Sequence, residues 1–216
     1  MTAEIIQGSE DWFRARCGCV TASRISDLMA KTRTGWGASR KNYAAQLLAE
    51  RLTGEVAESF SNAAMQWGTD TEPEARTAYE FWRNATVREV GFVVHPFIKS
   101  AGASPDGLVG DDGLVEIKCP NTATHLDTLE GGKIDRKYLY QMQWQMACTG
   151  RQWCDFVSYD PRLPETYRIH IERVERDADL VAELETEVKA FIAEIDSRET
   201  GLRQRFDPPV NTLAAG

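Results

Sequence analysis

Residues 104–119 read Ser104-Pro105-Asp106-Gly107-Leu108-Val109-Gly110-Asp111-Asp112-Gly113-Leu114-Val115-Glu116-Ile117-Lys118-Cys119, a stretch typical of a β-hairpin that carries charge. Pro105 and Gly107 mark a turn, and residues 110–113 are strong turn formers between two short strands, 108–109 and 114–119. A bend at Asp111 and Asp112 brings Asp106 level with residues 116–118. We therefore expect two carboxylates to be neighbours in space.

Strand alternation adds a second expectation for this hairpin. The odd-numbered residues of 115–119 fall on one face, which we expect to build core, and Glu116 and Lys118 fall on the other, which we expect to present charge. Adjacent carboxylates repel unless a cation separates them, and hard oxygen ligands suit Mg²⁺ or Mn²⁺. The trio indicates a metal-dependent site that cleaves phosphodiesters. The alternative is a surface Glu-Lys ion pair beside an ordinary turn aspartate.

Length and composition are those of an ordinary globular protein, with 216 residues, 42% hydrophobic and 27% charged. We expect a single domain over residues 1–216. The five cysteines lack paired Cys-x-x-Cys spacing, which predicts neither a zinc site nor a disulfide framework and favours a reducing cytosol. The sequence shows neither a basic-then-apolar leader nor an apolar run of membrane-spanning length, so we expect no secretion and no membrane partner.

Charge is unevenly distributed around the net value of −8. Between residues 14 and 49, seven basic residues stand against one acid, whereas residues 172–200 contain ten acids and four bases. The basic segment would suit phosphate binding while the acidic segment faces solvent or a partner, although a charged run is more often only a solvated face.

The remaining periodicity predicts helices around a small group of strands. Helices are expected from Ser9 to about Gly18, from Thr21 to about Ala30, from Ser39 to Gly54, over 61–84 with an interruption near Gly68, and over 125–130, 138–149 and 177–197. Strands are expected over 86–94, 152–159 and 166–172, and residues 32–38 are expected to form a flexible loop. This pattern predicts an α/β fold with a central mixed β-sheet flanked by helices.

The motifs carry a family resemblance. An aspartate in a turn followed by Glu-x-Lys on the next strand is the signature of the PD-(D/E)XK nuclease superfamily. The rest of the chain resembles the phage lambda exonuclease and YqaJ-like viral recombinase family, in the same order and over almost the whole length. The motifs are Trp12, Arg16, Gly18-x-x-Thr21-Ala22-Ser23, Trp67-Gly68-x-x-x-Glu72, Glu116-Ile117-Lys118-Cys119-Pro120, Gln141-Met142-Gln143 and Tyr159-Asp160-Pro161-Arg162.

The resemblance implies a restriction-endonuclease-like core and a magnesium-dependent exonuclease. Such an enzyme digests linear double-stranded DNA from 5′ to 3′, releases 5′-mononucleotides and leaves a 3′ single-stranded overhang for phage-type recombination. The resemblance also implies two Mg²⁺ per active site with Mn²⁺ as a substitute, a homotrimeric ring around double-stranded DNA ends, and a phage single-strand annealing protein as partner. The expected location is the bacterial cytosol, from a phage or prophage gene. The alternatives are a structure-specific or restriction-type DNA endonuclease and a non-catalytic DNA-end-binding module.

Four residues of the hairpin match catalytic positions of the family. Asp106 and Glu116 match its metal-binding acids, and the carbonyl of Ile117 matches its main-chain metal ligand. Lys118 matches the catalytic lysine, which positions or deprotonates the attacking water and steadies developing charge.

Two more residues match the family's active site from other segments. Glu72 matches an acid that helps to hold a second metal, and its alternative is an exposed helix partner of Arg76. Gln141 matches a glutamine that orients water or Lys118, and its alternative is an amide on a helix surface.

A third group implies recognition of a DNA end. Arg16, Ser23 and Ser104 match a pocket for the 5′-terminal phosphate, for which arginine and hydroxyl donors are suited. The alternatives are that Ser23 only caps a helix and that Arg16 is only a solvated helix residue. Met65 matches an apolar wedge that parts the terminal base pair. The family has a basic residue near the phosphate where this chain has Thr124 and His125, and we assign His125 no role.

Overall fold

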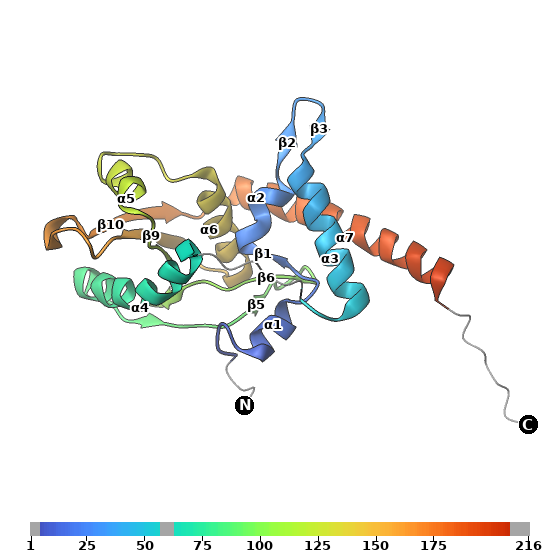
Figure 1. The fold of residues 1–216 in the computed structure, drawn as a ribbon, viewed down its shortest axis with the longest axis horizontal. Coiled ribbons are helices and arrows are strands. Elements are labelled where there is room, and N and C mark those ends of the chain that lie inside the picture. Colours follow the sequence, from blue (N-terminus) through green and yellow to red (C-terminus); the bar gives the residue numbers. More distant parts are fainter. Residues whose placement is uncertain (1–4, 57–62, 208–216) are drawn as a thin grey trace, which may run out of the picture.

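The hairpin of residues 107–118 lies inside the larger of the two main β-sheets in the computed structural model, which describes residues 5–56 and 63–207 (Figure 1). Strand β7 (Gly107–Val109) pairs antiparallel with β8 (Gly113–Lys118), with Leu108 opposite Leu114 and Gly107 opposite Val115. The next residue outward from Gly107 is Asp106, so it comes level with Glu116. The predicted hairpin and its register are confirmed.

The larger sheet has the order β10-β9-β8-β7-β4, with β10 (Ile169–Glu175), β9 (Trp153–Tyr159) and β4 (Val87–Arg88) beside the hairpin. Strands β8 and β9 run parallel, whereas the other neighbours are antiparallel. Helix α4 (Ala63–Arg83) packs on one face and α6 (Arg136–Thr149) on the other. The prediction of an α/β fold with a mixed sheet flanked by helices is confirmed.

The two faces of β8 enter two different cores. Val115 and Ile117 pack with Tyr79 of α4, whereas Leu114 packs with Met142 and other α6 residues. The even-numbered face is therefore not an open charged surface, as the alternation alone predicted, because α6 covers it. Glu116 lies fully buried beneath that helix.

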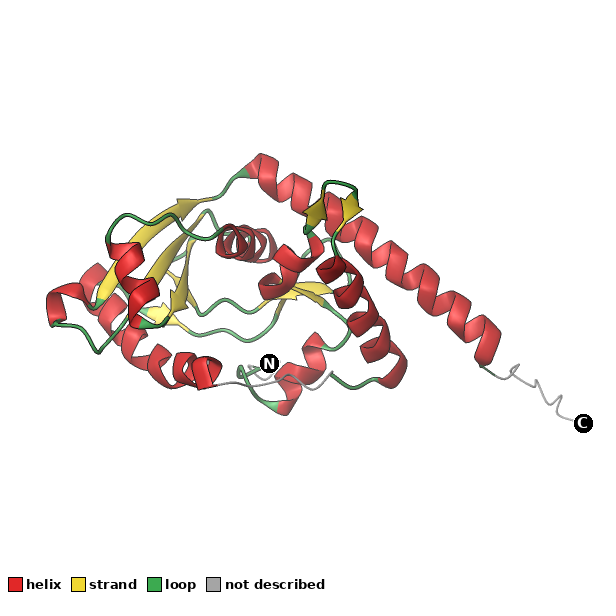
Figure 2. Cartoon of the chain, turned by 45° about the horizontal axis from the view of Figure 1, so that its top comes forward, coloured by secondary structure: helices red, strands yellow, loops and turns green. Residues whose placement is uncertain are grey.

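A second, smaller sheet holds the chain segment that leads into the hairpin. Its order is β1-β6-β5, with β1 (Val20–Thr21) parallel to β6 (Ala101–Ala103) and β5 (Val93–Val94) antiparallel to β6. The largest core cluster lies between this sheet and helices α2 (Ile25–Leu28), α3 (Ala38–Thr53), α6 and α7 (Ala178–Phe206). Figure 2 shows the strands gathered in these separate groups with helices around them, and α7 projects away from the body at its C-terminal end (Figure 1).

Several helix boundaries differ from the predictions. Helix α1 (Glu10–Arg16) is confirmed, with the hydroxyl of Ser9 accepting from the Trp12 amide. The predicted helix from Thr21 is instead β1, a 3₁₀ turn η1 (Ala22–Arg24) and the single turn α2. Helix α3 is preceded by Gly37 rather than capped by Ser39. Helix α4 runs through Gly68 without interruption, because burial of its apolar face outweighs the roughly 1 kcal/mol cost of a helical glycine. Residues 61 and 62 of the expected helix lie outside the described residues.

The bounds of the strands and of the later helices also differ from those predicted. The strand expected over 86–94 is two strands, β4 and β5, in different sheets. The loop expected over 32–38 contains a hairpin, β2 (Lys31–Thr32) and β3 (Gly35–Trp36), whose turn uses Gly35 at a positive φ of 136°. Strand β10 starts later than expected because η2 (Glu165–Tyr167) precedes it. The remaining helices are longer: α5 (Thr122–Leu129), α6 from Arg136, and α7 to Phe206.

Within the described ranges, no helix is both long and apolar enough to cross a membrane. All five cysteines are free thiols. The extent of the domain, predicted as residues 1–216, stays a prediction.

Candidate active site

An open cleft of about 410 Å³ lies between α4 and the end of β8. Five of the predicted site residues line it: Met65, Glu72, Asp106, Ile117 and Lys118. Glu116 lies just beneath, because the ammonium of Lys118 is ion-paired with its carboxylate. The fold therefore brings the acids, the lysine and the predicted wedge residue to one cleft, although they come from α4, the turn before β7, and β8.

Asp106 is tied to β8 by its side chain, since Oδ2 accepts a 2.7 Å hydrogen bond from the backbone amide of Ile117. Burial raises the pKa of Asp106 well above its usual range, and the negative charge of Glu116 raises it further. Lys118 and the Ile117 amide act in the opposite direction without cancelling these effects. The carboxyl groups of Asp106 and Glu116 therefore lie close together, and the positive charge of Lys118 does not offset the cost of ionising both.

Glu116 is fully buried and its two oxygens have different partners. Oε1 takes the ion pair with Lys118 and a 2.6 Å hydrogen bond from Gln141 Nε2. Oε2 accepts a 2.6 Å hydrogen bond from Gln145 Nε2. A buried carboxylate is strongly unfavourable unless it is paired and hydrogen-bonded, and these three donors meet that need. The predicted contact of Gln141 with the site is therefore present, and Gln141 is not simply a surface amide.

Sequence reasoning missed Gln145. Its signal was the four-residue spacing from Gln141, which places both amides on the same face of a helix. A second glutamine at that spacing, with apolar residues on either side of it, would have indicated a second donor for a buried acid.

Lys118 remains a cation in this arrangement. Although burial alone lowers its pKa, the carboxylates of Glu116 and Asp106 outweigh that effect and raise the pKa above its ordinary value. Its ammonium also lies 5.2 Å from the centre of the Tyr138 ring, which lines the same cleft. Lys118 is therefore a hydrogen-bond donor that supplies positive charge to the cleft.

Glu72 enters the cleft from α4 and also forms the predicted ion pair with Arg76, at 2.7 Å. Arg76 contacts Glu89 on its other side, again at 2.7 Å. Burial raises the pKa of Glu72, and Arg76 works against that rise. Both readings of Glu72 therefore describe the structure: it is the helix partner of Arg76 and a carboxylate facing the cleft.

The donor set fits a hard divalent cation. Asp106 and Glu116 both supply carboxylate oxygens, and the two groups repel each other when ionised. A hard divalent cation bound between them would offset that repulsion. Across the described ranges, no group of three or more His, Cys, Asp or Glu side chains is already arranged as a metal cage. Glu72 would thus join from the opposite wall of the cleft, on α4.

The predicted phosphate-binding residues Arg16 and Ser104 are in direct contact. The guanidinium of Arg16 donates to Ser104 Oγ at 3.0 Å, and the Trp12 indole donates to the same oxygen at 2.9 Å. Arg16 also stacks on the Trp12 ring, 4.0 Å from its centre. Burial lowers the pKa of Arg16, which nevertheless stays a cation because its ordinary pKa is so high. Ser104 lies two residues before Asp106, so one short chain segment carries both this group and a carboxylate of the cleft.

Ser23 lies near this group through strand pairing. Thr21 of β1 pairs with Gly102 of β6, and the two strands run parallel, so Ser23 and Ser104 follow at the same end. Ser23 belongs to η1 rather than capping a helix, and its side chain is exposed. In the described part of the chain, no hydrogen bond links Ser23 with Arg16 or Ser104.

The basic segment of residues 14–49 is only partly available for phosphates. Arg40 is buried, donates to the Leu28 carbonyl at 2.9 Å and stacks on Trp36. Arg24 pairs with Asp27 at 2.6 Å. The count of basic residues therefore overstates the positive surface that this segment presents.

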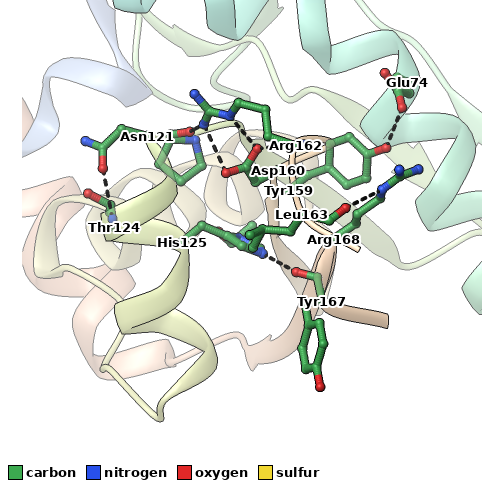
Figure 3. Close-up of polar contacts among 12 residues, drawn as sticks. Glu74, Asn121, Thr124, His125, Tyr159, Asp160, Arg162, Leu163, Tyr167 and Arg168 are labelled. Atoms are coloured by element: carbon green, nitrogen blue, oxygen red, sulfur yellow. Dashed lines mark hydrogen bonds and ion pairs between the residues drawn. The ribbon is translucent and has the colours of Figure 1, made fainter. Parts of the chain in front are cut away.

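Residues 160–168, the β9–β10 loop, make a group of polar contacts with neighbouring segments (Figure 3). Arg162 donates to Asp160 and to the carbonyl of Pro120, which lines the cleft. Its guanidinium also lies 4.6 Å from the centre of the Trp67 ring on α4. One residue before the loop, the Tyr159 hydroxyl donates a hydrogen bond of 2.7 Å to the Glu74 carboxylate of α4. These contacts fix the helix that carries Glu72 relative to the strand that carries Lys118.

His125 belongs to the same supporting network. Its ring is buried, with Nδ1 2.7 Å from Ser158 Oγ and Nε2 2.8 Å from the Tyr167 carbonyl, the second contact visible in Figure 3. Both ring nitrogens are thus engaged between α5, β9 and the β9–β10 loop. This histidine holds elements together and does not replace a phosphate contact.

Residues 11–152 match the model of the YqaJ-like viral recombinase domain, which spans the cleft and the Arg16–Ser104 pair. The chain belongs to the YqaJ-like viral recombinase family. Crystal structures of LHK-Exo, an alkaline exonuclease from Laribacter hongkongensis, are 55% and 54% identical to this recombinase-family chain. Each of the two matches covers 91% of this chain and 97% of the LHK-Exo chain, with a TM-score of 0.86. One of the two LHK-Exo structures is a complex with dAMP.

A phage-related exonuclease from Haemophilus somnus 129PT shares the fold of this YqaJ-like chain at 17% identity. It covers 85% of this chain and 96% of that one, with a TM-score of 0.69. A comparison with curated proteins finds no match. Family membership and the exonuclease relatives make this protein a nuclease of the viral recombinase family.

Proposed function

We propose that this nuclease is a divalent-cation-dependent 5′ to 3′ exonuclease of linear double-stranded DNA, which releases 5′-mononucleotides and leaves a 3′ overhang for single-strand annealing. The observation that carries the proposal is the meeting of Asp106, Glu116 and Lys118 at one cleft, with Ser104 of the Arg16–Ser104 pair only two residues before Asp106 in the chain. Cleaving groups and a phosphate-binding pair that share one chain segment suit the terminal nucleotide of a strand.

The chemistry follows from the charges around the cleft. Asp106 and Glu116 would hold Mg²⁺, with Mn²⁺ as a substitute, the Ile117 carbonyl as a further ligand and Glu72 serving a second ion. The bound cation would polarise the scissile phosphate and lower the pKa of a water molecule, so that the water more readily loses a proton and attacks the phosphorus. Lys118, kept protonated by the acids, donates to the attacking water or to a phosphate oxygen and offsets developing negative charge. Gln141 holds Glu116 Oε1 in place.

Recognition of the end falls to a separate group. Arg16 offers a charged donor for a 5′-terminal phosphate, and Ser104 shares that position through its hydrogen bond with Arg16. We assign Ser23 to the same pocket from its place in η1, two residues after the end of β1. Met65 is exposed on the cleft wall, where an apolar side chain could separate the terminal base pair.

The assembly is proposed on the family's precedent. A homotrimeric ring around the duplex would let a chain of net charge −8 bind DNA, because only the inner surface need be basic. A phage single-strand annealing protein is the expected partner, since the 3′ overhang is its substrate. Solution mass tests the ring independently of the chemistry.

Topology of the substrate gives the deciding test of the proposed activity. With Mg²⁺, linear 5′-phosphorylated duplex should be degraded to mononucleotides, whereas covalently closed circular duplex of the same sequence should survive. Digestion of both at equal rates would favour an endonuclease. End binding without nucleotide release would favour a non-catalytic end-binding module.

A further inference from the structure

Gln145 contacts the candidate active site from its buried side. It lies one helical turn beyond Gln141 on α6, it is fully buried, and its Nε2 donates to Glu116 Oε2 at 2.6 Å. Within the described residues, its side-chain Oε1 has no hydrogen-bond partner. An unpaired buried amide oxygen is unfavourable, so packing alone would favour an apolar residue here.

Gln143, on the same helix, shows what a structural glutamine looks like in this protein. It is also buried, but it uses both ends of its amide: Nε2 donates to the Glu175 carbonyl at 2.8 Å and Oε1 accepts from the Asp177 amide at 2.9 Å. It therefore ties α6 to the junction where β10 ends and α7 begins. Gln145 instead makes one hydrogen bond from α6 to β8, and that bond goes to a carboxylate oxygen of Glu116 rather than to a backbone group.

The partners of Glu116 divide its carboxylate into two sides. Oε1 is shared by Lys118, which lines the cleft, and by the half-buried Gln141. Oε2 is on the buried side and is held by Gln145. A donor on Oε2 fixes the plane of the carboxylate from behind, and it leaves Oε1 as the oxygen that faces the cleft.

We propose that Gln145 is a positioning residue that orients Glu116 for a hard divalent cation. This inference rests on the proposed cation-dependent activity. Partners that orient a ligating carboxylate from behind contribute strongly, and their loss lowers metal affinity or activity roughly 10–100-fold. Gln141 alone cannot replace this contact, because it binds the other oxygen of Glu116.

The variant Gln145→Met tests the assignment, because methionine keeps the length of the side chain and removes both polar atoms. Cation binding is measured calorimetrically with Mn²⁺ in the absence of DNA, and the Mg²⁺ concentration for half-maximal exonuclease rate is measured separately. The dissociation constant for Mn²⁺ and the half-maximal Mg²⁺ concentration should both rise by roughly tenfold or more, whereas KM for DNA should stay at the wild-type value. Gln145→Asn, which keeps an amide but shortens its reach, should show the same loss and provides the test if the methionine variant folds poorly.

Gln143→Met is the matched control on the same helix. It should lose thermal stability through its two backbone contacts yet keep the cation constants of the wild type. Unchanged cation constants in Gln145→Met, or an equal weakening in Gln143→Met, would overturn the positioning role. If the wild type itself neither binds Mn²⁺ nor digests DNA, the proposed function fails instead, so the two failures are distinguishable.

Discussion

Lys118 and Glu116 form an ion pair two residues apart on β8, with the carboxylate fully buried and the lysine side chain 26% exposed. The pair joins the interior of the sheet to the cleft, because Glu116 is held beneath α6 while Lys118 reaches the opening. Lys118 therefore serves two purposes: it offsets a buried charge, and it supplies a cation where phosphodiester chemistry would occur.

Replacing Lys118 should separate cleavage from binding. Lys118→Ala is expected to lower the rate of nucleotide release by a factor on the order of 10²–10⁴, with little change in the affinity for a DNA end measured in Ca²⁺. Lys137→Ala is the control, because that lysine side chain is 52% exposed, forms an ion pair with Asp135 and contacts the Tyr138 ring, but does not line the cleft. Cleavage at the wild-type rate by Lys118→Ala would remove this lysine from the chemistry.

Asp106 predicts how activity depends on pH. Because burial and Glu116 raise its pKa, a proton competes with the cation for this carboxylate. Activity should therefore rise with pH through a range above the ordinary pKa of an aspartate, and the midpoint of that rise should move to lower pH as the Mg²⁺ concentration increases. Rate profiles at two Mg²⁺ concentrations provide the measurement, and coincident midpoints would show that Asp106 does not control the rise.

The same pKa makes a prediction for stability without a cation. A carboxyl group whose folded pKa is raised binds its proton more tightly in the folded chain than in the unfolded chain, so stability falls as pH rises between the two pKa values. Asp106→Asn removes that charge and can still accept from the Ile117 amide. Its free energy of unfolding at neutral pH, measured in EDTA with urea, should exceed that of the wild type by about 1–2 kcal/mol, while nuclease activity is lost. A less stable variant would contradict this account.

Arg16 should set the preference for a 5′ phosphate. Arg16→Ala is expected to reduce the rate on 5′-phosphorylated duplex by roughly 10–100-fold, the value of a charged hydrogen bond, with a much smaller effect on duplex ending in a 5′ hydroxyl. Arg14→Ala is the control from the same helix, because that side chain is 74% exposed and pairs with Asp11. An equal loss on both substrates would indicate that Arg16 stabilises the fold around Ser104 instead.

Met65 should matter only where base pairs must be opened. Opening a base step costs a few kcal/mol, so Met65→Ala should slow digestion of blunt duplex by roughly tenfold. Ends that are already frayed by terminal mismatches should be digested at nearly the wild-type rate. The side chain is 53% exposed, so the melting temperature should not change. A slowing that is the same on both kinds of end would argue against a wedge.

Local sequence signals were sufficient to predict the central hairpin. Pro105, Gly107 and residues 110–113 determine the turns, and the register that places Asp106 beside Glu116 follows from strand geometry alone. Strand β6 could not be predicted, because Ala-Gly-Ala has little intrinsic preference for a strand. Its position depends on tertiary packing, in which Gly102 lies against Phe92 and accepts a hydrogen bond from the Trp144 indole at 3.2 Å.

The residues whose side chains would carry out the chemistry were predictable from the sequence. The residues that hold those side chains in place were not. Family resemblance brought in Glu72, Gln141 and Arg16, which no local pattern would have joined to the hairpin. The burial of Glu116 was missed, because alternation cannot show whether a helix covers the polar face of a strand. Gln145 and the β9–β10 loop were missed for the same reason, since their contacts join segments far apart in the sequence.

The release of end labels from linear duplex tests the central claim most directly. The duplex carries a 5′ phosphate on each strand and a label at either the 5′ or the 3′ end of one strand, and nucleotides are followed over time with Mg²⁺ or with EDTA. The account predicts immediate release of the 5′ label as a mononucleotide, with the 3′ label retained in a long single strand and no release in EDTA. Early release of the 3′ label, internal fragments, or release without a divalent cation would contradict it.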